Sequence, residues 1–155
     1  MSEVTTELPV FLIPLQKSNM ILPTQAVAEI IPYEPLQRLQ DSPDWFLGFL
    51  AWRGIQVPVA SFEMLSAERS SFSLVSVASA SLVLIKAQQG QADLPFFALV
   101  AQTLPNQIRV TPDGLIELDD ELHRTELVRA RMQDQIVSIP DLNYIEDEIR
   151  STAYQ

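Results

Sequence analysis

The sequence contains no cysteine, only four glycines and a single histidine in 155 residues. Without cysteine the chain forms neither disulfides nor thiolate metal sites, which fits a reducing cytosol. So few glycines make a backbone-lined phosphate site hard to build, and no phosphate-binding glycine loop, G-x-S-x-G elbow or H-E-x-x-H motif is present. These absences argue against catalysis, so we expect a protein that is not an enzyme and uses no cofactor.

Basic residues are also scarce, with ten Lys and Arg against twenty Asp and Glu, for a net charge of −10. A nucleic-acid partner is therefore not expected, because a phosphate backbone requires a basic patch. The excess is uneven, since residues 111–150 hold eleven acids and four arginines. This pattern indicates a solvated acidic surface that keeps the protein soluble, or alternatively a directed acidic docking face.

Long uncharged segments are missing as well. No stretch reaches about 18 residues without a charge or a proline, so we expect no membrane insertion. The first residues, MSEVTTELPVFLIPL, lack the basic flank and cleavage site of a secretory signal. We therefore expect a cytoplasmic protein. Hydrophobic residues make up 47% of the chain, which is enough for one packed domain or two small lobes that share a core.

The apolar segments are short and resemble strands, which predicts an all-β fold with short helices. The expected strands cover residues 9–15, 19–22, 27–32, 50–52, 55–59, 81–87, 95–101, 106–110, 127–132 and 135–140. Thr111-Pro112-Asp113 indicates a turn or helix start, and residues 117–126 a charged loop. Asp141 is expected to N-cap a short helix over residues 142–149. His123 lies in the charged loop, where a metal site is possible but a solvated loop is the better interpretation.

The most distinctive segment is WFLGFLAWRGIQVPVASFEML, residues 45–65. Two apolar arms flank Arg53-Gly54, and an X-Gly pair between such arms predicts a tight hairpin. Glycine supplies the positive φ that a two-residue turn requires. We therefore expect Arg53 to project from the tip of the hairpin, flanked by Trp52, where arginine and tryptophan have the character of interface anchors.

The chain repeats itself weakly at an offset of 80 residues. GIQVPVASFEML, from Gly54, aligns with DQIVSIPDLNYI, from Asp134, so that Val57 meets Val137. Chance similarity between two β segments is one interpretation. The other is a pair of related barrels, each closed by a strand and a short helix. On that interpretation residues 1–155 form one domain, with lobe 1 at about 8–65, lobe 2 at about 81–149 and a serine-rich connector at 66–80.

Two motifs resemble the CheW family of chemotaxis adaptors. VAEI, residues 27–30, precedes GFLAWRGIQVPV, residues 48–59. The family shows a V-x-E-V/I strand, a loop, and then G-V/I-x-N-L-R-G-x-V/I-x-P-V/I-x-D-L. The resemblance covers about residues 8–148. It implies two five-stranded SH3-like barrels packed around a shared core, and a scaffold that couples methyl-accepting chemoreceptors to a CheA-type histidine kinase.

The resemblance also implies a binding site. In the family the positions matching Val27, Glu29, Gly48, Arg53 and Gly54 belong to the receptor-binding region near the junction of the lobes. Several of the candidate residues have a structural alternative. Arg53 could form a salt bridge with Glu29 or Glu63, and Gly48 could be a turn glycine. Val27 and Trp52 could be core residues.

The sequence departs from the family pattern at several positions. Ala51 and Trp52 stand where Asn and Leu are usual, and Ser61 stands where Asp is usual. These departures favour a divergent member, such as the ChpC-like adaptors of chemosensory systems linked to type IV pili. The alternative function is a barrel that binds a small apolar ligand. Bulky residues expected to point inward, Val57, Val59, Ile136 and Ile139, weigh against it.

Overall fold

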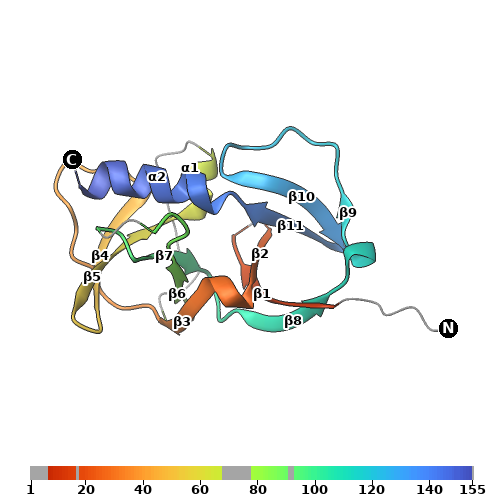
Figure 1. Cartoon of the computed structure of the whole chain (residues 1–155), viewed down its shortest axis with the longest axis horizontal. Helices are drawn as coiled ribbons and strands as arrows, with labels where there is room; N and C mark the ends of the chain where they lie inside the picture. The colour runs from red at the N-terminus through yellow and green to blue at the C-terminus, as the bar shows by residue number, and fades with distance from the viewer. Residues whose placement is uncertain (1–6, 17, 68–77, 91–92, 155) are drawn as a thin grey trace.

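The described part of the chain folds into two mixed β-sheets and two α-helices (Figure 1). The computed structural model describes residues 7–16, 18–67, 78–90 and 93–154. In chain order the elements are β1 (Leu8–Pro14), β2 (Asn19–Pro23), the 3-10 helix η1 (Thr24–Ala26), β3 (Val27–Pro32), β4 (Phe46–Trp52), β5 (Ile55–Ala60), α1 (Phe62–Ala67), β6 (Ser81–Lys86), β7 (Phe96–Ala101), β8 (Asn106–Val110), the 3-10 helix η2 (Pro112–Gly114), β9 (Ile116–Glu117), β10 (Glu126–Met132), β11 (Gln135–Pro140) and α2 (Leu142–Ala153). The expected all-β class with short helices is confirmed.

The two sheets have matching strand orders. The five-stranded sheet runs β3-β6-β7-β5-β4, and the six-stranded sheet runs β8-β1-β2-β11-β10-β9. Each contains one parallel pair at the same place, β5 with β7 and β11 with β2. Among the described residues β9, two residues long, is the one strand outside the shared order, and in its place on β4 the other sheet has an isolated bridge between Gln37 and Phe49. Each sheet therefore forms one of two related SH3-like lobes, called below the five-stranded and the six-stranded lobe.

The repeat extends to the backbone irregularities. A bulge interrupts β4 between Phe46 and Gly48, and another interrupts β10 at the positions 80 residues later. Leu50 pairs with Val57, and the corresponding pair in the other lobe is Ala130 with Val137. Val57 and Val137 are both fully buried. They thus occupy equivalent positions, as the 80-residue offset predicts.

The boundary between the lobes differs from the one expected at residues 66–80. β1 and β2 belong to the six-stranded sheet with β8 to β11, while β6 and β7 complete the five-stranded sheet. The five-stranded lobe is continuous in sequence, and the other lobe is assembled from both ends of the chain. The 80-residue offset could not reveal this, because it aligns only a hairpin and the helix after it. Residues 68–77, most of the expected connector, lie outside the described residues.

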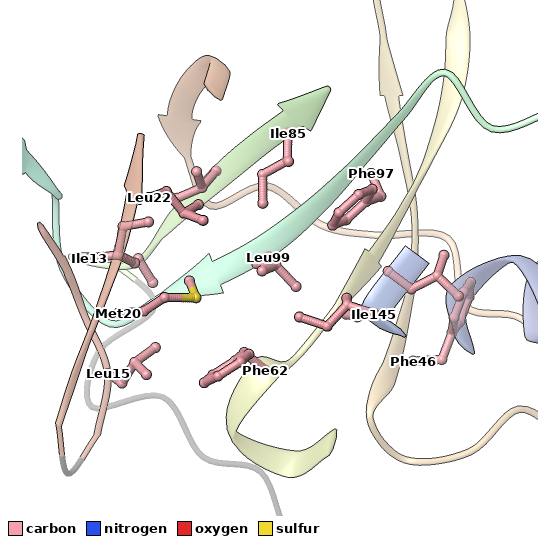
Figure 2. Packing of buried hydrophobic residues seen from close by; sticks show 14 of the residues in the cluster. Ile13, Leu15, Met20, Leu22, Phe46, Phe62, Ile85, Phe97, Leu99 and Ile145 are labelled. Carbon is pink, nitrogen blue, oxygen red and sulfur yellow. The ribbon is translucent and has the colours of Figure 1, made fainter. Parts of the chain in front are cut away.

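Three apolar clusters form the interior. The shared core, part of which Figure 2 shows, contains residues from both sheets and both helices: Ile13, Leu15, Met20, Leu22, Phe46, Ala60, Phe62, Val83, Ile85, Leu94, Phe97, Leu99, Ala101, Ile145 and Ile149. The five-stranded lobe has its own cluster: Leu50, Val57, Val59, Leu82, Leu84, Ala98 and Val100. The six-stranded lobe has a smaller one: Val10, Ile21, Val110, Ala130 and Val137.

Strands at the joint between the lobes are buried on both faces. In β6, Leu82 and Leu84 point into the cluster of their own lobe, whereas Val83 and Ile85 point into the shared core. This division follows from the strand period of two, which sends successive side chains to opposite faces. All four side chains are fully buried, and each such burial stabilises the fold by about 1.5–3 kcal/mol.

Helix α2 follows β11 and lies along the five-stranded lobe (Figure 1). The Asp141 side chain accepts a hydrogen bond from the Tyr144 amide at 3.2 Å, so the predicted N-cap is confirmed. The helix continues to Ala153, beyond the expected end at Ile149. Its apolar face, with Ile145 and Ile149, is buried in the shared core.

A buried carboxylate fixes α2 to the turn after β6. Glu146 is fully buried, and it accepts hydrogen bonds from the backbone amides of Gln88 at 2.6 Å and Gln89 at 3.2 Å. These amides replace the water that a buried carboxylate loses. Arg150 adds an ion pair to Asp93 at 3.1 Å. The helix therefore ties the two lobes together at a second place.

Because the sheets interleave, neither sequential half should fold alone. We expect fragments 1–67 and 78–155 to lack a cooperative thermal transition by circular dichroism, while the whole chain unfolds in one step. Each fragment lacks strands that its sheet needs and exposes part of the shared core. A fragment 78–155 that melts cooperatively by itself would contradict this expectation.

Candidate functional site

The predicted hairpin joins β4 to β5 through a two-residue turn. Arg53 has φ +48° and Gly54 has φ +81°, so both central residues are left-handed, as in a type I′ turn. Gly54 adopts this conformation readily, while Arg53 adopts it at a cost because it carries a Cβ. The matching turn in the other lobe likewise has a left-handed first residue, Gln133 at φ +57°.

The Glu29 carboxylate organises the side chains at this turn. Its Oε1 accepts hydrogen bonds from the Trp52 indole Nε1 at 2.8 Å and from Arg53 Nη2 at 3.1 Å. The Arg53 guanidinium also lies over the Trp52 ring, 4.7 Å from its centroid, in a cation–π arrangement. The Arg53 side chain nevertheless remains 70% exposed. Glu29 and Trp52 thus hold the guanidinium in place, while most of the Arg53 side chain remains open to solvent.

The same contacts bring the two edges of the five-stranded sheet together. Glu29 lies on β3 and Trp52 on β4, which are opposite edge strands. Residues after β3 reinforce this closure, because Gln37 and Phe49 exchange backbone hydrogen bonds at 2.8 and 2.9 Å. The sheet therefore curls into a barrel whose seam carries Arg53. This closure brings Glu29 to Arg53, so the Arg53–Glu29 salt bridge that was considered as a structural alternative is present.

The other expected site residues lie near the seam in different roles. Val27 begins β3 and is half-buried against the shared core. Gly48 lies on β4 with φ +137°, and a Cβ there would fall 2.5 Å from the Gln37 carbonyl oxygen. Gly54 has open space around it. The structure thus joins Glu29, Trp52 and Arg53 directly, while the glycines shape the backbone around them.

Two supporting residues were not identified from the sequence. Phe96, at the start of β7, packs edge-on against Trp52 with ring centroids 5.0 Å apart. Gln37 lies between the strands expected at 27–32 and 50–52, outside any expected element, yet it pairs with Phe49 on β4. Neither carries a local sequence signal, because both contacts depend on how the barrel closes.

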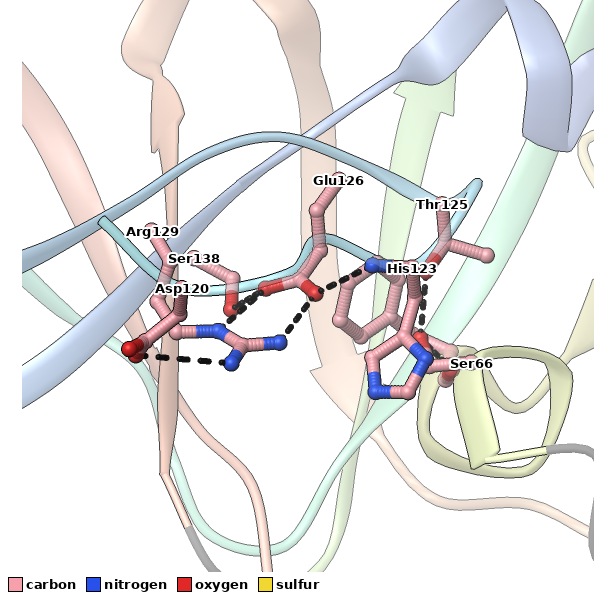
Figure 3. Close-up of polar contacts among 8 residues, drawn as sticks. Ser66, Asp120, His123, Thr125, Glu126, Arg129 and Ser138 are labelled. Carbon is pink, nitrogen blue, oxygen red and sulfur yellow. Dashed lines mark hydrogen bonds and ion pairs between the residues drawn. The ribbon is translucent and has the colours of Figure 1, made fainter. Parts of the chain in front are cut away.

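A second polar cluster surrounds Glu126 in the six-stranded lobe (Figure 3). Its carboxylate accepts hydrogen bonds from Arg129 Nη2 at 2.6 Å, Ser138 Oγ at 2.7 Å and the His123 amide at 3.1 Å. Burial alone would raise the pKa of Glu126, but these hydrogen bonds outweigh it and hold the pKa below its ordinary value of 4.5. Part of the expected charged loop is therefore an ordered polar network.

This cluster also connects the lobes. The hydroxyls of Ser66, in α1, and Thr125 lie 2.6 Å apart, and the Thr125 carbonyl accepts a hydrogen bond from the Asp141 amide at 2.7 Å. Asp120 adds an ion pair to Arg129 at 3.7 Å. The network thus links α1, the segment before β10 and the start of α2.

Two further sequence expectations concerned ligands. Among the described residues, no group of three or more His, Asp or Glu side chains is placed to hold a metal ion. Ile136, expected to point into the barrel, is 37% exposed. That expectation was wrong because Val137, not Ile136, faces the interior cluster.

No helix in the described part of the chain is long and apolar enough to cross a membrane.

Two SH3-like β lobes around a shared core, with an arginine presented at a barrel seam, define a two-lobed β scaffold. A family model for the CheW-like domain matches residues 9–149, so the chain belongs to the CheW-like family. The crystal structure of the scaffolding protein TtCheW from Thermoanaerobacter tengcongensis is similar to this fold, with a TM-score of 0.72 and 12% sequence identity. That match covers 92% of this chain and 89% of TtCheW. No curated protein sequence matches the chain.

The two site glycines should differ in their tolerance of a side chain. Gly54→Ala meets no neighbouring atom and should cost about 1 kcal/mol from its positive φ alone. Gly48→Ala also clashes with the Gln37 backbone, so it should cost clearly more, about 2 kcal/mol or above. Urea unfolding of both variants measures the difference. Equal losses would show that the contact with Gln37 is relieved without cost.

Glu126 should make the fold sensitive to acid. Its folded pKa is lowered, so its stabilisation is complete above the unfolded value near 4.5 and is lost as pH falls through the folded pKa. Glu126→Gln should lose about 1–3 kcal/mol at neutral pH. Its unfolding free energy should then fall less steeply than that of wild type below pH 4.5.

Urea unfolding at a series of pH values provides the measurement, with the exposed turn variant Asp134→Asn as the control. Parallel pH curves for wild type and Glu126→Gln would contradict the assignment.

Proposed function

We propose that this protein is a non-enzymatic adaptor that couples the cytoplasmic tip of a methyl-accepting chemoreceptor to a CheA-type histidine kinase. Membership of the CheW-like family supports a role in chemotaxis signalling. The receptor contacts the surface made by Glu29, Trp52 and Arg53. Gly48 and Gly54 set the backbone there, and Val27 supports the strand that carries Glu29.

The positioned guanidinium of Arg53 is the observation that carries the receptor site. A free arginine side chain loses rotamer entropy when a partner immobilises it. Here Glu29 and Trp52 already restrict the guanidinium while most of its side chain stays exposed. A pre-oriented arginine beside an indole has the composition of a binding hot spot. Receptor binding at this seam therefore requires little new ordering of the adaptor.

The adaptor acts by holding its two partners beside each other. Binding energy at two separate surfaces holds the kinase beside the receptor, and shifts in receptor packing then bias the kinase between conformations. This mechanism requires no cofactor and no catalytic group. It assigns the protein to the cytoplasm, where the tip of a chemoreceptor and a cytosolic kinase meet.

The finer assignment is a divergent adaptor of the ChpC-like kind, acting in a chemosensory system linked to type IV pili. Its support is the departure from the family motif, with Trp52 in place of leucine. That departure has a structural role, since the Trp52 indole donates a hydrogen bond to Glu29 and a leucine side chain has no donor. The alternative function, a barrel that binds small apolar ligands, loses support because Leu50, Val57 and Val59 fill the five-stranded lobe.

Arg53→Ala should separate binding from folding. The ion pair with Glu29 is largely exposed, so its loss should cost about 1 kcal/mol of stability or less. Affinity for the cytoplasmic fragment of the cognate receptor should fall by about 2 kcal/mol or more, because the anchor is lost. Calorimetric titration measures this, with Arg109→Ala on β8 as the matched control. Unchanged affinity in a folded Arg53→Ala protein would restrict Arg53 to closing the barrel.

A further inference from the structure

The Trp52 indole, which borders Arg53, has an aromatic neighbour on another strand. The ring of Phe96, at the start of β7, lies edge-on to the indole, with the ring centroids 5.0 Å apart and the planes at 72°. The Arg53 guanidinium lies over the same indole, and the indole N–H donates to Glu29. Phe96 therefore contacts the group on which the arrangement of Arg53 depends.

The hydrogen bond to Glu29 requires one orientation of the indole. A tryptophan side chain rotates about two bonds, and only a conformation that directs Nε1 toward β3 brings it to the 2.8 Å distance seen here. An edge-on aromatic pair favours a defined orientation, because the positive edge of one ring faces the negative face of the other. Without the Phe96 ring the indole regains other conformations, in which Glu29 loses a donor and the guanidinium loses its aromatic contact.

The ion pair alone does not hold the guanidinium in one place. The side chains of Arg53 and Glu29 are 70% and 37% exposed. Exposed pairs of this kind contribute little, since water screens the charges and two flexible side chains must be ordered. The indole adds a cation–π contact to Arg53 and fixes the carboxylate to which Arg53 donates. The orientation of Arg53 therefore depends on the orientation of Trp52.

Phe96 is itself held in place through the joint between the lobes. It pairs with Lys86 on β6, and the Ala87 amide donates to the Pro95 carbonyl at 3.0 Å, so β7 is joined to β6 from its first residue. The next residue, Phe97, is fully buried in the shared core (Figure 2). Because successive side chains of a strand alternate, Phe97 anchors β7 on one face while Phe96 packs beside the five-stranded cluster on the other. The position of Phe96 thus follows from the shared core.

We propose that Phe96 is a positioning residue for the surface around Arg53, because it sets the orientation of Trp52. It acts through the indole and does not touch the partner. The effect on receptor binding rests on the proposed function, whereas the effect on the indole does not. It follows that a tryptophan at position 52 serves this surface only together with an aromatic ring at position 96.

The free protein tests the orientation directly, in two variants at neighbouring positions. Phe96→Leu removes the ring beside the indole, and Phe97→Leu removes a ring from the shared core one residue later. In proton–nitrogen correlation NMR spectra, Trp45→Phe identifies the indole N–H signal of Trp52. In Phe96→Leu this signal should move toward the position of a solvated indole and exchange with solvent about tenfold faster. In Phe97→Leu it should keep its wild-type position, although this core variant loses more unfolding free energy in urea.

Two results of this comparison overturn the proposal. One is a Trp52 signal that Phe96→Leu leaves unchanged. The other is a signal that Phe97→Leu moves as far as Phe96→Leu does, because the indole would then report a general loss of packing rather than its contact with Phe96.

Calorimetric titration with the cytoplasmic receptor fragment tests the consequence for binding. Phe96→Leu should weaken binding about tenfold, and it should have no further effect in a chain that already carries Arg53→Ala. Losses that add in the double variant overturn the proposal, since Phe96 would then act independently of Arg53. Wild-type affinity in Phe96→Leu overturns the role of Phe96 in binding and leaves the proposed function standing. A wild-type chain that binds no receptor overturns the proposed function, while the indole signal still decides the orientation.

Discussion

The shared core is the constraint on which the rest of the structure depends. Strands β1, β2, β6 and β7 each place one face in their own lobe and the other against the opposite lobe, so they are apolar on both sides. A lobe of this size buries too little surface to be robust alone. The stability of each barrel therefore includes that of its neighbour. The β4–β5 turn that carries Arg53 lies away from this joint, at one end of the molecule (Figure 1), and not near the junction of the lobes as the family resemblance implies.

The two lobes use one architecture for different purposes. Bulges and turns recur 80 residues apart, yet the polar groups on this common frame differ. In the five-stranded lobe Glu29 holds an arginine toward solvent. In the six-stranded lobe Glu126 is buried and holds Arg129 against the sheet. One carboxylate holds a charge at the solvent-exposed surface, while the other holds a charge against the protein itself.

Local features were predictable because they depend on neighbouring residues. The Arg53-Gly54 turn, the Asp141 cap and most strand positions followed from turn chemistry, capping and period. Strand β4 begins at Phe46 rather than Leu50, since a bulge disturbs the alternation there. Long-range pairings such as β2 with β11 carry no local pattern. The contact of Glu29 with Trp52 depends on barrel closure, so it was not predicted, and the Glu29–Arg53 salt bridge was considered only as an alternative.

The parallel pairing of β2 with β11 also affects how the protein is made. Asn19 pairs with Val137, so β2 cannot complete its pairing until β11 has been synthesised. Strands β1 and β2 are synthesised before the other described strands, and the hairpin that they make in the folded protein has apolar residues on both faces. The five-stranded lobe is completed at Ala101, but the edge of β2 stays unpaired until β11 leaves the ribosome. Such an edge invites pairing with other chains. The nascent chain thus carries an unpaired apolar edge from the synthesis of β2 until the synthesis of β11.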